Sequence, residues 1–284
     1  MSDIKQKSGY QIEDPNNVGE IIVSWIITHA CMENCGYCIS PPKKTEELSL
    51  KEHFIIQEKL INDGVTKIRY IGGEPLLIPH LPKLIADAFS KGVNTRLSTN
   101  GILLTEEKFK EIRPFVNSIA LPFESLNDDL NEKIRGSRLH RQIVSSRILM
   151  IKKAGGIGLL INTCVHKENI KELEKLGKFL NEQGVDHWKL RLFSPASGRG
   201  AVPNKKRFEV TDKEFSQIVG RLQNKYTNIR IDGRMPSKLA SRLLVSPQGD
   251  LYRMIGSEDK NVYYGNLFND NLDIKQIARK DNCN

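Results

Sequence analysis

Apolar positions along the chain follow two alternating patterns. Short β-branched runs bounded by turn residues predict strands over residues 20–29, 65–73, 93–101, 116–123, 157–165 and 186–195. Longer stretches with apolar residues at helical spacing predict helices over residues 48–64, 80–92, 105–115, 140–156, 168–184 and 211–226. The chain therefore alternates between strand and helix six times, from residue 20 to about residue 195.

This alternation predicts the fold class. Each strand is apolar enough to be covered on both faces, which is typical of a parallel sheet with right-handed crossovers. Such units suit either a doubly wound sheet or an open, partial (β/α) barrel. In both folds function lies at the carboxyl ends of the strands, and the unusual motifs of this chain follow the first four strands.

Length and composition indicate which class of protein the chain belongs to. The chain has 284 residues, of which 39% are hydrophobic and 27% charged, as in ordinary soluble proteins. Its longest apolar run, residues 21–27, is too short to span a membrane, and the N-terminus shows no secretory signal. We expect a cytoplasmic protein with reduced thiols. The net charge of +9 indicates either an unspecific basic surface or an anionic partner, and composition does not separate them.

Three of the five cysteines lie within residues 31–38, with the sequence CMENCGYC. A disulfide would leave an odd thiol and contradicts the expected compartment. A zinc site would need a further ligand, and none of the candidates stands at a familiar spacing: His29, His53 or Cys164. Three thiolates on one tight loop can instead hold three irons of a cubane iron–sulfur cluster and leave the fourth iron open.

This cysteine spacing after a first strand, with Tyr37 before the last cysteine, resembles the radical S-adenosylmethionine (radical SAM) superfamily. Supporting matches follow the next strands in order, namely GGEPLL (72–77), STNG (98–101) and ESLNDDLNEKIRG (124–136). The resemblance covers about residues 20–200. It implies an α/β fold, a partial (β/α)6 TIM-like barrel, over residues 20–195, after an N-terminal segment 1–19. A small C-terminal α+β extension, residues 196–284, would then cover the barrel mouth.

The resemblance also implies the cofactors. One [4Fe-4S] cluster would be held by Cys31, Cys35 and Cys38, and S-adenosylmethionine would chelate the open iron. An electron from a flavodoxin- or ferredoxin-type donor would cleave the carrier to methionine and a 5′-deoxyadenosyl radical, which abstracts a substrate hydrogen. The cofactor supplies this chemistry, and the protein supplies positioning and the exclusion of water.

The superfamily pattern assigns further contacts to the carrier. Gly72 and Gly73 would let the backbone approach its methionine end, and Glu74 would accept from its ammonium group, unless these residues form an ordinary turn with a solvent-facing carboxylate. The remaining expected cofactor-binding residues are Tyr37, Ser98, Asn100, Ser125 and Asn162. Ser98 and Asn100 share a face of the third strand, Ser125 follows a Pro122 that stands where relatives carry serine, and Asn162 interrupts an apolar strand.

The second half of the chain bears on the substrate. The segment YYGNLFND (263–270) resembles the extensions of peptide-modifying radical SAM enzymes (SPASM or twitch type), which usually bind further clusters. Only Cys283 remains in this region, so we expect no auxiliary cluster. The layout of residues 187–252 also resembles viperin-type enzymes, which dehydrate a nucleoside triphosphate. A hairpin is expected over residues 241–255.

The sixth strand places Lys189 and Arg191 on one face. If that face points into the barrel, the pair suits a phosphate or carboxylate, and otherwise it faces solvent. We predict a monomeric radical SAM enzyme acting on a small, anionic, nucleotide-like substrate, with neither membrane nor nucleic acid as partner. The alternatives are a short peptide-modifying enzyme without auxiliary clusters, and a non-catalytic metal-binding or regulatory relative.

Overall fold

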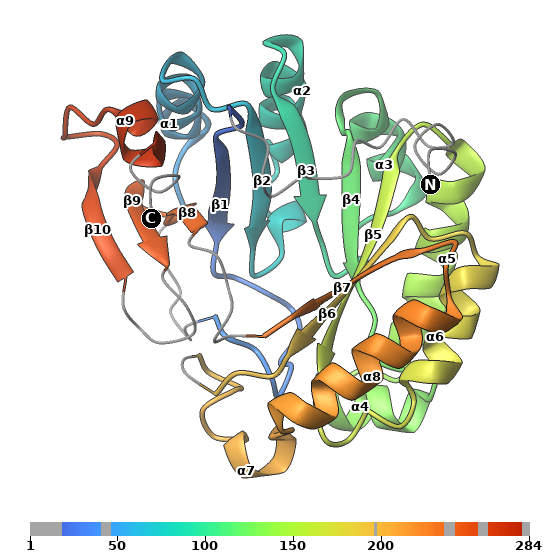
Figure 1. Ribbon diagram of the computed structural model, residues 1–284. Coiled ribbons are helices and arrows are strands. Elements are labelled where there is room, and N and C mark those ends of the chain that lie inside the picture. Colours follow the sequence, from blue (N-terminus) through green and yellow to red (C-terminus); the bar gives the residue numbers. More distant parts are fainter. Residues whose placement is uncertain (1–18, 41–46, 196–197, 236–241, 255–260, 280–284) are drawn as a thin grey trace.

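The computed structural model describes residues 19–40, 47–195, 198–235, 242–254 and 261–279 (Figure 1). The described strands form one sheet in the order β10-β9-β8-β1-β2-β3-β4-β5-β6-β7. Their bounds are β1 Ile22–Thr28, β2 Lys67–Gly72, β3 Asn94–Ser98, β4 Ser118–Pro122, β5 Gly158–Val165, β6 His187–Leu192, β7 Arg230–Arg234, β8 Arg242–Val245, β9 Asp250–Met254 and β10 Asn261–Asn266. Strands β1 to β7 run parallel to one another, and β8 runs parallel to β1. Strand β9 is antiparallel to both of its neighbours, β8 and β10.

Helices cover the outer, convex face of this curved sheet (Figure 1). Their bounds are α1 Leu50–Asn62, α2 Leu81–Ser90, α3 Glu106–Ile112, α4 Asp128–Arg135, α5 His140–Ala154, α6 Leu173–Glu182, α7 Lys205–Phe208, α8 Asp212–Lys225 and α9 Ile274–Arg279, with short 3-10 turns η2 Pro75–Leu77 and η3 Arg113–Phe115. The sheet does not close, so the predicted partial barrel is confirmed. Most predicted elements reappear with shifted ends, and α4, α7, α9, β7 and β10 are additions.

Local signals explain several of these boundaries. Ser49 and Glu52 form a capping box at the start of α1, and Thr211 and Glu214 form the same motif at the start of α8. Helix α4 ends at Gly136, whose left-handed φ of 80° a side chain would make costly. These capping residues determine where α1 and α8 begin and where α4 ends, and therefore which residues are left to form the loops between helices and strands.

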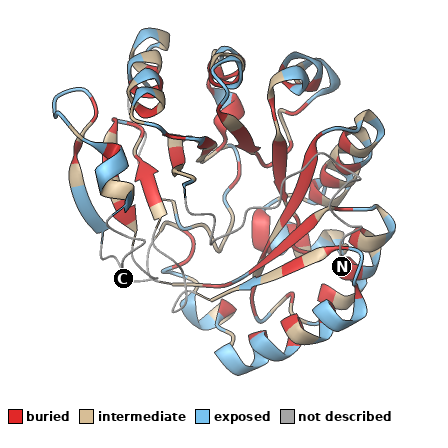
Figure 2. Cartoon of the chain, turned by 45° about the horizontal axis from the view of Figure 1, so that its top comes forward, coloured by how far each residue is buried: buried red, intermediate tan, exposed pale blue. Residues whose placement is uncertain are grey.

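The main core lies between the strands and the outer helices, as the buried residues in Figure 2 show. Val23, Trp25 and Ile27 of β1 are fully buried and belong to the same apolar cluster as Ile56 and Leu60 of α1. Because strand side chains alternate between faces, the residues between these point to the concave face. Ser24 and Ile26 of β1 therefore face the inside of the partial barrel.

The C-terminal part continues the sheet on both sides. Strand β7 pairs with β6, with Arg191 opposite Arg234, and β8 pairs with β1, with Val23 opposite Leu243. The expected hairpin is present as β8 and β9. The division at residues 19 and 195 stays a prediction, and both the N-terminal segment up to residue 18 and Cys283 lie outside the described residues. None of the described helices is long and apolar enough to cross a membrane.

Candidate functional site

The cysteine loop, residues 31–38, follows β1 at the carboxyl end of the sheet. All three of its cysteines are free thiols and partly exposed. A turn holds the loop, with the Cys38 amide donating to the Cys35 carbonyl at 3.0 Å, and the Gly36 amide donates to the Ile134 carbonyl of α4 at 2.8 Å. The backbone therefore presents three thiols on one ordered loop.

A segment after β6, residues 198–204, packs directly on this loop. The Gly200 and Ala201 amides both donate to the Cys38 carbonyl at 3.1 Å, and Asn204 Nδ2 donates to the Gly36 carbonyl at 3.2 Å. A Cβ on Gly200 would lie 2.2 Å from the Cys35 carbonyl oxygen, so a side chain would force the two segments apart. Sequence reasoning assigned no such role to these residues, because glycines in a loop carry no signal of what lies against them.

The loop fits a cluster better than a single ion. Among the described residues, no three Cys, His, Asp or Glu side chains converge closely enough to hold one metal ion. Two of the three candidate zinc partners are engaged elsewhere, since His53 Nδ1 lies 2.7 Å from His80 Nε2 and Cys164 packs against an apolar cluster with Phe193 and Phe208. The third, His29, has a buried Nδ1 without a hydrogen-bond partner among the described residues. Three separate thiols suit a cubane, in which each thiolate binds its own iron.

Glu74 is completely buried at the end of β2, which excludes the solvent-facing alternative. Its carboxylate accepts hydrogen bonds from the Leu76 amide at 3.1 Å, the Thr99 hydroxyl at 2.7 Å and the Asn100 amide at 2.7 Å. Burial raises the pKa of this carboxyl above its ordinary value, although the hydrogen bonds oppose the shift. Among the described residues, no cation forms a salt bridge with this carboxyl group.

Gly72 and Gly73 have a packing reason to be glycine. A Cβ on Gly72, which has a φ of 147°, would lie 2.3 Å from the Thr28 carbonyl oxygen. A Cβ on Gly73 would lie 2.1 Å from the Ala30 carbonyl oxygen. Both glycines thus let the loop after β2 lie against the end of β1, next to the first cysteine.

Two other residues predicted to bind the cofactor, Ser98 and Asn100, lie at the end of β3 and just beyond it. Asn100 lies beyond the end of β3, so it does not share a strand face with Ser98 as the sequence suggested. Its Nδ2 donates to Met32 Sδ at 3.1 Å and lies 4.0 Å from Cys31 Sγ. Ser98 is partly exposed at the last position of β3.

Ser125, Asn162 and Tyr37 lie around the same end of the sheet. The Ser125 hydroxyl accepts from the Asn127 amide at 3.0 Å and thus shapes the turn before α4. Asn162 Oδ1, on the inner face of β5, is buried without a hydrogen-bond partner in the described structure. The ring of Tyr37 stacks on His166 at 5.9 Å, and its hydroxyl accepts from Arg135. The orphaned amide oxygen of Asn162 indicates a missing polar partner.

The concave face is strongly basic. Trp188 and Leu190 of β6 belong to the outer core, so Lys189 and Arg191 point inward, and register places Arg191 opposite Arg234. The acid Asp232, opposite Lys189, is shared among three groups, as it contacts His187 Nε2 at 2.9 Å, Arg230 Nε at 3.1 Å and Arg234 NH2 at 3.5 Å.

Two arginines on this face, Arg191 and Arg242, have lowered pKa values. Arg191 is exposed at its surface, and desolvation together with the nearby Arg242, Arg69 and Arg234 lowers its pKa to about 10. Burial, Arg69 and Arg234 likewise lower the pKa of Arg242, whose Nε is buried without a hydrogen-bond partner. Like charges held together in this way favour an anion.

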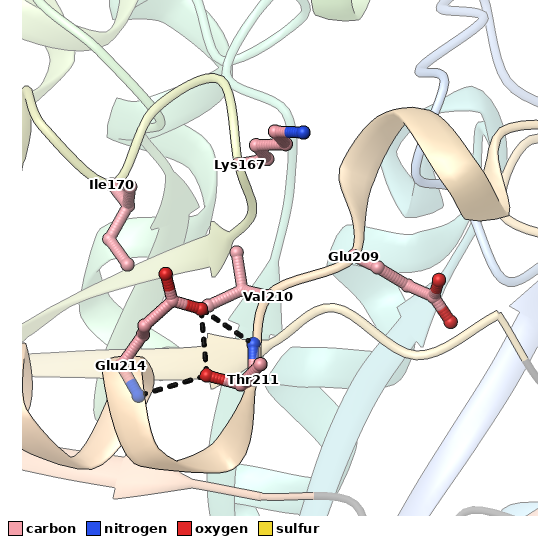
Figure 3. Close-up of a pocket in the computed structure, with 6 residues that line it drawn as sticks. All are labelled: Lys167, Ile170, Glu209, Val210, Thr211 and Glu214. Carbon is pink, nitrogen blue, oxygen red and sulfur yellow. Dashed lines mark hydrogen bonds between the residues drawn. The ribbon is translucent and has the colours of Figure 1, made fainter.

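A surface pocket of about 430 Å³ lies away from this face, between the start of α8 and the loop after β5 (Figure 3). Lys167, Glu209 and Glu214 line it, together with Ile170, Val210 and Thr211. Glu214 is occupied in the capping box with Thr211, as the dashed lines in Figure 3 show. This pocket contains none of the predicted site residues.

The chain is similar to known proteins over most of its length. The model of the radical SAM superfamily matches residues 25–180, more than half of the chain. The chain is 27% identical to an S-adenosylmethionine-dependent nucleotide dehydratase of Lacinutrix mariniflava over 91% of this chain and 60% of that protein. It is 29% identical to a PqqA peptide cyclase of Gluconobacter oxydans over 56% of this chain and 45% of that protein.

Among solved structures, Streptococcus suis SuiB bound to S-adenosylmethionine has a TM-score of 0.74 at 14% identity, over 89% of this chain and 64% of that one. This similarity shows a shared fold. The chain thus spans about half to two thirds of the length of these three proteins.

Proposed function

The chain belongs to the radical SAM superfamily, and from this premise we propose that it uses S-adenosylmethionine for radical chemistry on a small, anionic, nucleotide-like substrate. The superfamily's cofactors are a [4Fe-4S] cluster and S-adenosylmethionine. When bound, they supply the electron transfer and bond cleavage, whereas the protein binds, orients and shields the reactants. Cys31, Cys35 and Cys38 would hold the cluster.

The residues beside the cysteine loop would hold the carrier. Glu74, buried without a salt bridge among the described residues, would pair with its ammonium group. Asn100, which already reaches Cys31, and Asn162, whose amide oxygen lacks a partner, would supply polar contacts. Glu74 and Asn100 follow the ends of β2 and β3, and Asn162 lies on the inner face of β5.

The basic concave face carries the substrate proposal. Arg69, Arg191, Arg234 and Arg242 lie near one another inside the partial barrel, close enough for their charges to interact. Guanidinium groups bind phosphate through paired, charge-assisted hydrogen bonds. A polyphosphate would neutralise this cluster and place the attached nucleoside toward the strand ends, where the cysteine loop lies.

Peptide modification is the alternative function. It is supported by the similarity to the PqqA peptide cyclase and by the fold shared with SuiB. The cyclase match covers 56% of the chain, whereas the nucleotide dehydratase match covers 91% and so includes the part that supplies Arg234 and Arg242. We therefore favour the nucleotide.

The reconstituted protein with S-adenosylmethionine should bind ribonucleoside triphosphates, and inorganic triphosphate should compete. Replacing Arg191 by Gln removes a charge-assisted contact, so the affinity should fall about ten- to hundred-fold. Isothermal titration calorimetry measures both effects. Added salt should weaken binding, because dissolved ions screen the exposed charge of Arg191.

Arg138→Gln is the matched control for this measurement. Arg138 is an exposed arginine that pairs with Asp129 and Glu132 near α4, outside the concave face, so its loss should leave the affinity unchanged. Equal affinity of the Arg191→Gln variant and the unmodified protein would contradict the substrate proposal, as would binding of a neutral peptide in place of any triphosphate.

Replacing Glu74 by Gln tests the carrier site. The change removes the buried negative charge at nearly constant volume, so S-adenosylmethionine should bind about ten- to hundred-fold more weakly while the iron content stays the same. Equilibrium dialysis with labelled S-adenosylmethionine gives the affinity.

Thr99→Val is the control for Glu74. It deletes the 2.7 Å hydrogen bond to the same carboxylate and the bond that the Thr99 hydroxyl accepts from the Gly101 amide at 3.1 Å, and it leaves the charge in place. It should lower stability modestly and leave carrier affinity nearly unchanged. If Thr99→Val weakens binding as much as Glu74→Gln does, Glu74 acts by holding the loop rather than by pairing with the ammonium group.

A further inference from the structure

A buried arginine at the end of α4 connects the cysteine loop to the segment after β4. Arg135, the last residue of α4, is buried and makes a forked contact with Glu33, with Nε 3.3 Å from Oε1 and NH2 on Oε2. Its NH1 donates to Glu124 Oε2 at 2.8 Å and to the Tyr37 hydroxyl. Two residues of the cysteine loop and one residue after β4 therefore share a single guanidinium.

Glu33 lies between the first two cysteines. Its carboxylate Oε2 is 4.0 Å from Cys35 Sγ, and its amide donates to Cys31 Sγ at 3.4 Å. The residue is only 8% exposed, so water screens its charge poorly. This carboxylate is thus buried beside two of the thiols that would hold the cluster.

Arg135 is the permanent cation of this group. His140 Nε2 lies 3.5 Å from Glu124 and its Nδ1 lies 3.9 Å from Glu33 Oε1, but burial lowers the pKa of His140 and favours the neutral ring. Arg199 NH2 donates to the backbone carbonyl of Glu33 at 3.2 Å, not to its carboxylate. Arg135 is therefore the cation that pairs with the Glu33 carboxylate, 102 residues away in the sequence, and it also pairs with Glu124.

We propose that Arg135 is a positioning residue that anchors the cysteine loop and neutralises Glu33, so that the cluster can accept an electron next to a buried carboxylate. A negative charge near the cluster opposes reduction, and the paired guanidinium cancels that effect. Its planar fork also fixes the loop in a way that the single ammonium of lysine does not. The inference rests on cluster binding and is independent of the substrate.

The test is the midpoint potential of the reconstituted cluster, followed by electron paramagnetic resonance. Glu33→Gln should move the potential to a more positive value and Arg135→Gln to a more negative one. Each change should alter the reduced-to-oxidised ratio about tenfold, which is roughly 60 mV for one electron. The double variant Glu33→Gln with Arg135→Gln should return close to the unmodified potential.

If Arg135 neutralises charge, Glu33→Gln and Arg135→Gln shift the midpoint potential in opposite directions. If Arg135 only supports the fold, both variants shift the potential in the same direction. Arg135→Lys keeps the charge, so the potential should stay near that of the unmodified protein while iron retention falls through loss of the fork. Arg141→Gln is the control, because Arg141 makes a bidentate pair with Asp128 at 2.8 Å at the partly exposed start of α5. It should change neither quantity.

Arg135→Gln leaves two carboxylates buried without a cation, a large destabilisation. If Arg135→Gln does not fold, the midpoint potential of Glu33→Gln alone tests the proposal, because in that variant Arg135 still pairs with Glu124. A potential that is unchanged or more negative in Glu33→Gln overturns the inference. Failure of the unmodified protein to bind iron would instead refute the proposed function, so the two outcomes are distinguishable.

Discussion

Replacing Cys35 by Ala should abolish the iron–sulfur cluster and S-adenosylmethionine cleavage together, while the protein stays folded. Each thiolate of the loop would bind one iron, so the loss of one leaves two anchors for a cubane. The three cysteine side chains are partly exposed, so truncation creates no large core cavity. Anaerobically reconstituted protein should contain about four irons and four sulfides per chain, and the variant close to none. Cys31→Ala and Cys38→Ala should behave alike.

Cys164→Ala is the matched control for this experiment. Cys164 lies on the inner face of β5 and packs beside Tyr37 and Phe193, and burial raises the pKa of its thiol. Its removal should preserve the iron content. Full iron content in Cys35→Ala would contradict the assignment of the loop, and eight irons per chain would reveal a second cluster that we do not expect.

A ribonucleoside triphosphate should increase the formation of 5′-deoxyadenosine at least about tenfold and should itself be modified, whereas a neutral peptide should do neither. The physical reason is placement, because binding on the basic face would hold the sugar within reach of the carrier and exclude water. Chromatography of reactions with each of the four nucleotides measures both products. A rise in 5′-deoxyadenosine without a modified nucleotide would mean that the anion binds in an unproductive position.

Much of the site could be predicted because its signals are local in sequence. The three cysteines stand on one loop, and Gly72, Gly73 and Glu74 follow the next strand directly. Alternation along β6 placed Lys189 and Arg191 on one face, opposite Trp188 and its neighbours in the core. Patterns with a period of two or of 3.6 residues record which face is buried, so the strands and the main helices were predictable.

The remaining features depend on contacts between distant parts of the chain. Glu33 and Arg135 are 102 residues apart, and neither side chain indicates its partner in the sequence. Strand β7 has the sequence RIDGR, in which charged inner residues hide the apolar alternation, so its pairing with β6 was missed. The contact of Gly200 with Cys35 likewise becomes visible only when the loop after β6 lies on the cysteine loop.

The central claim is that the hydrogen removed by this enzyme comes from a nucleotide. Its most direct test is an anaerobic reaction with ribonucleoside triphosphates deuterated on the sugar, followed by mass spectrometry of the 5′-deoxyadenosine. Deuterium from one nucleotide should appear in 5′-deoxyadenosine, in proportion to the modified nucleotide. Unlabelled 5′-deoxyadenosine with every deuterated nucleotide, together with transfer from a deuterated peptide, would contradict it.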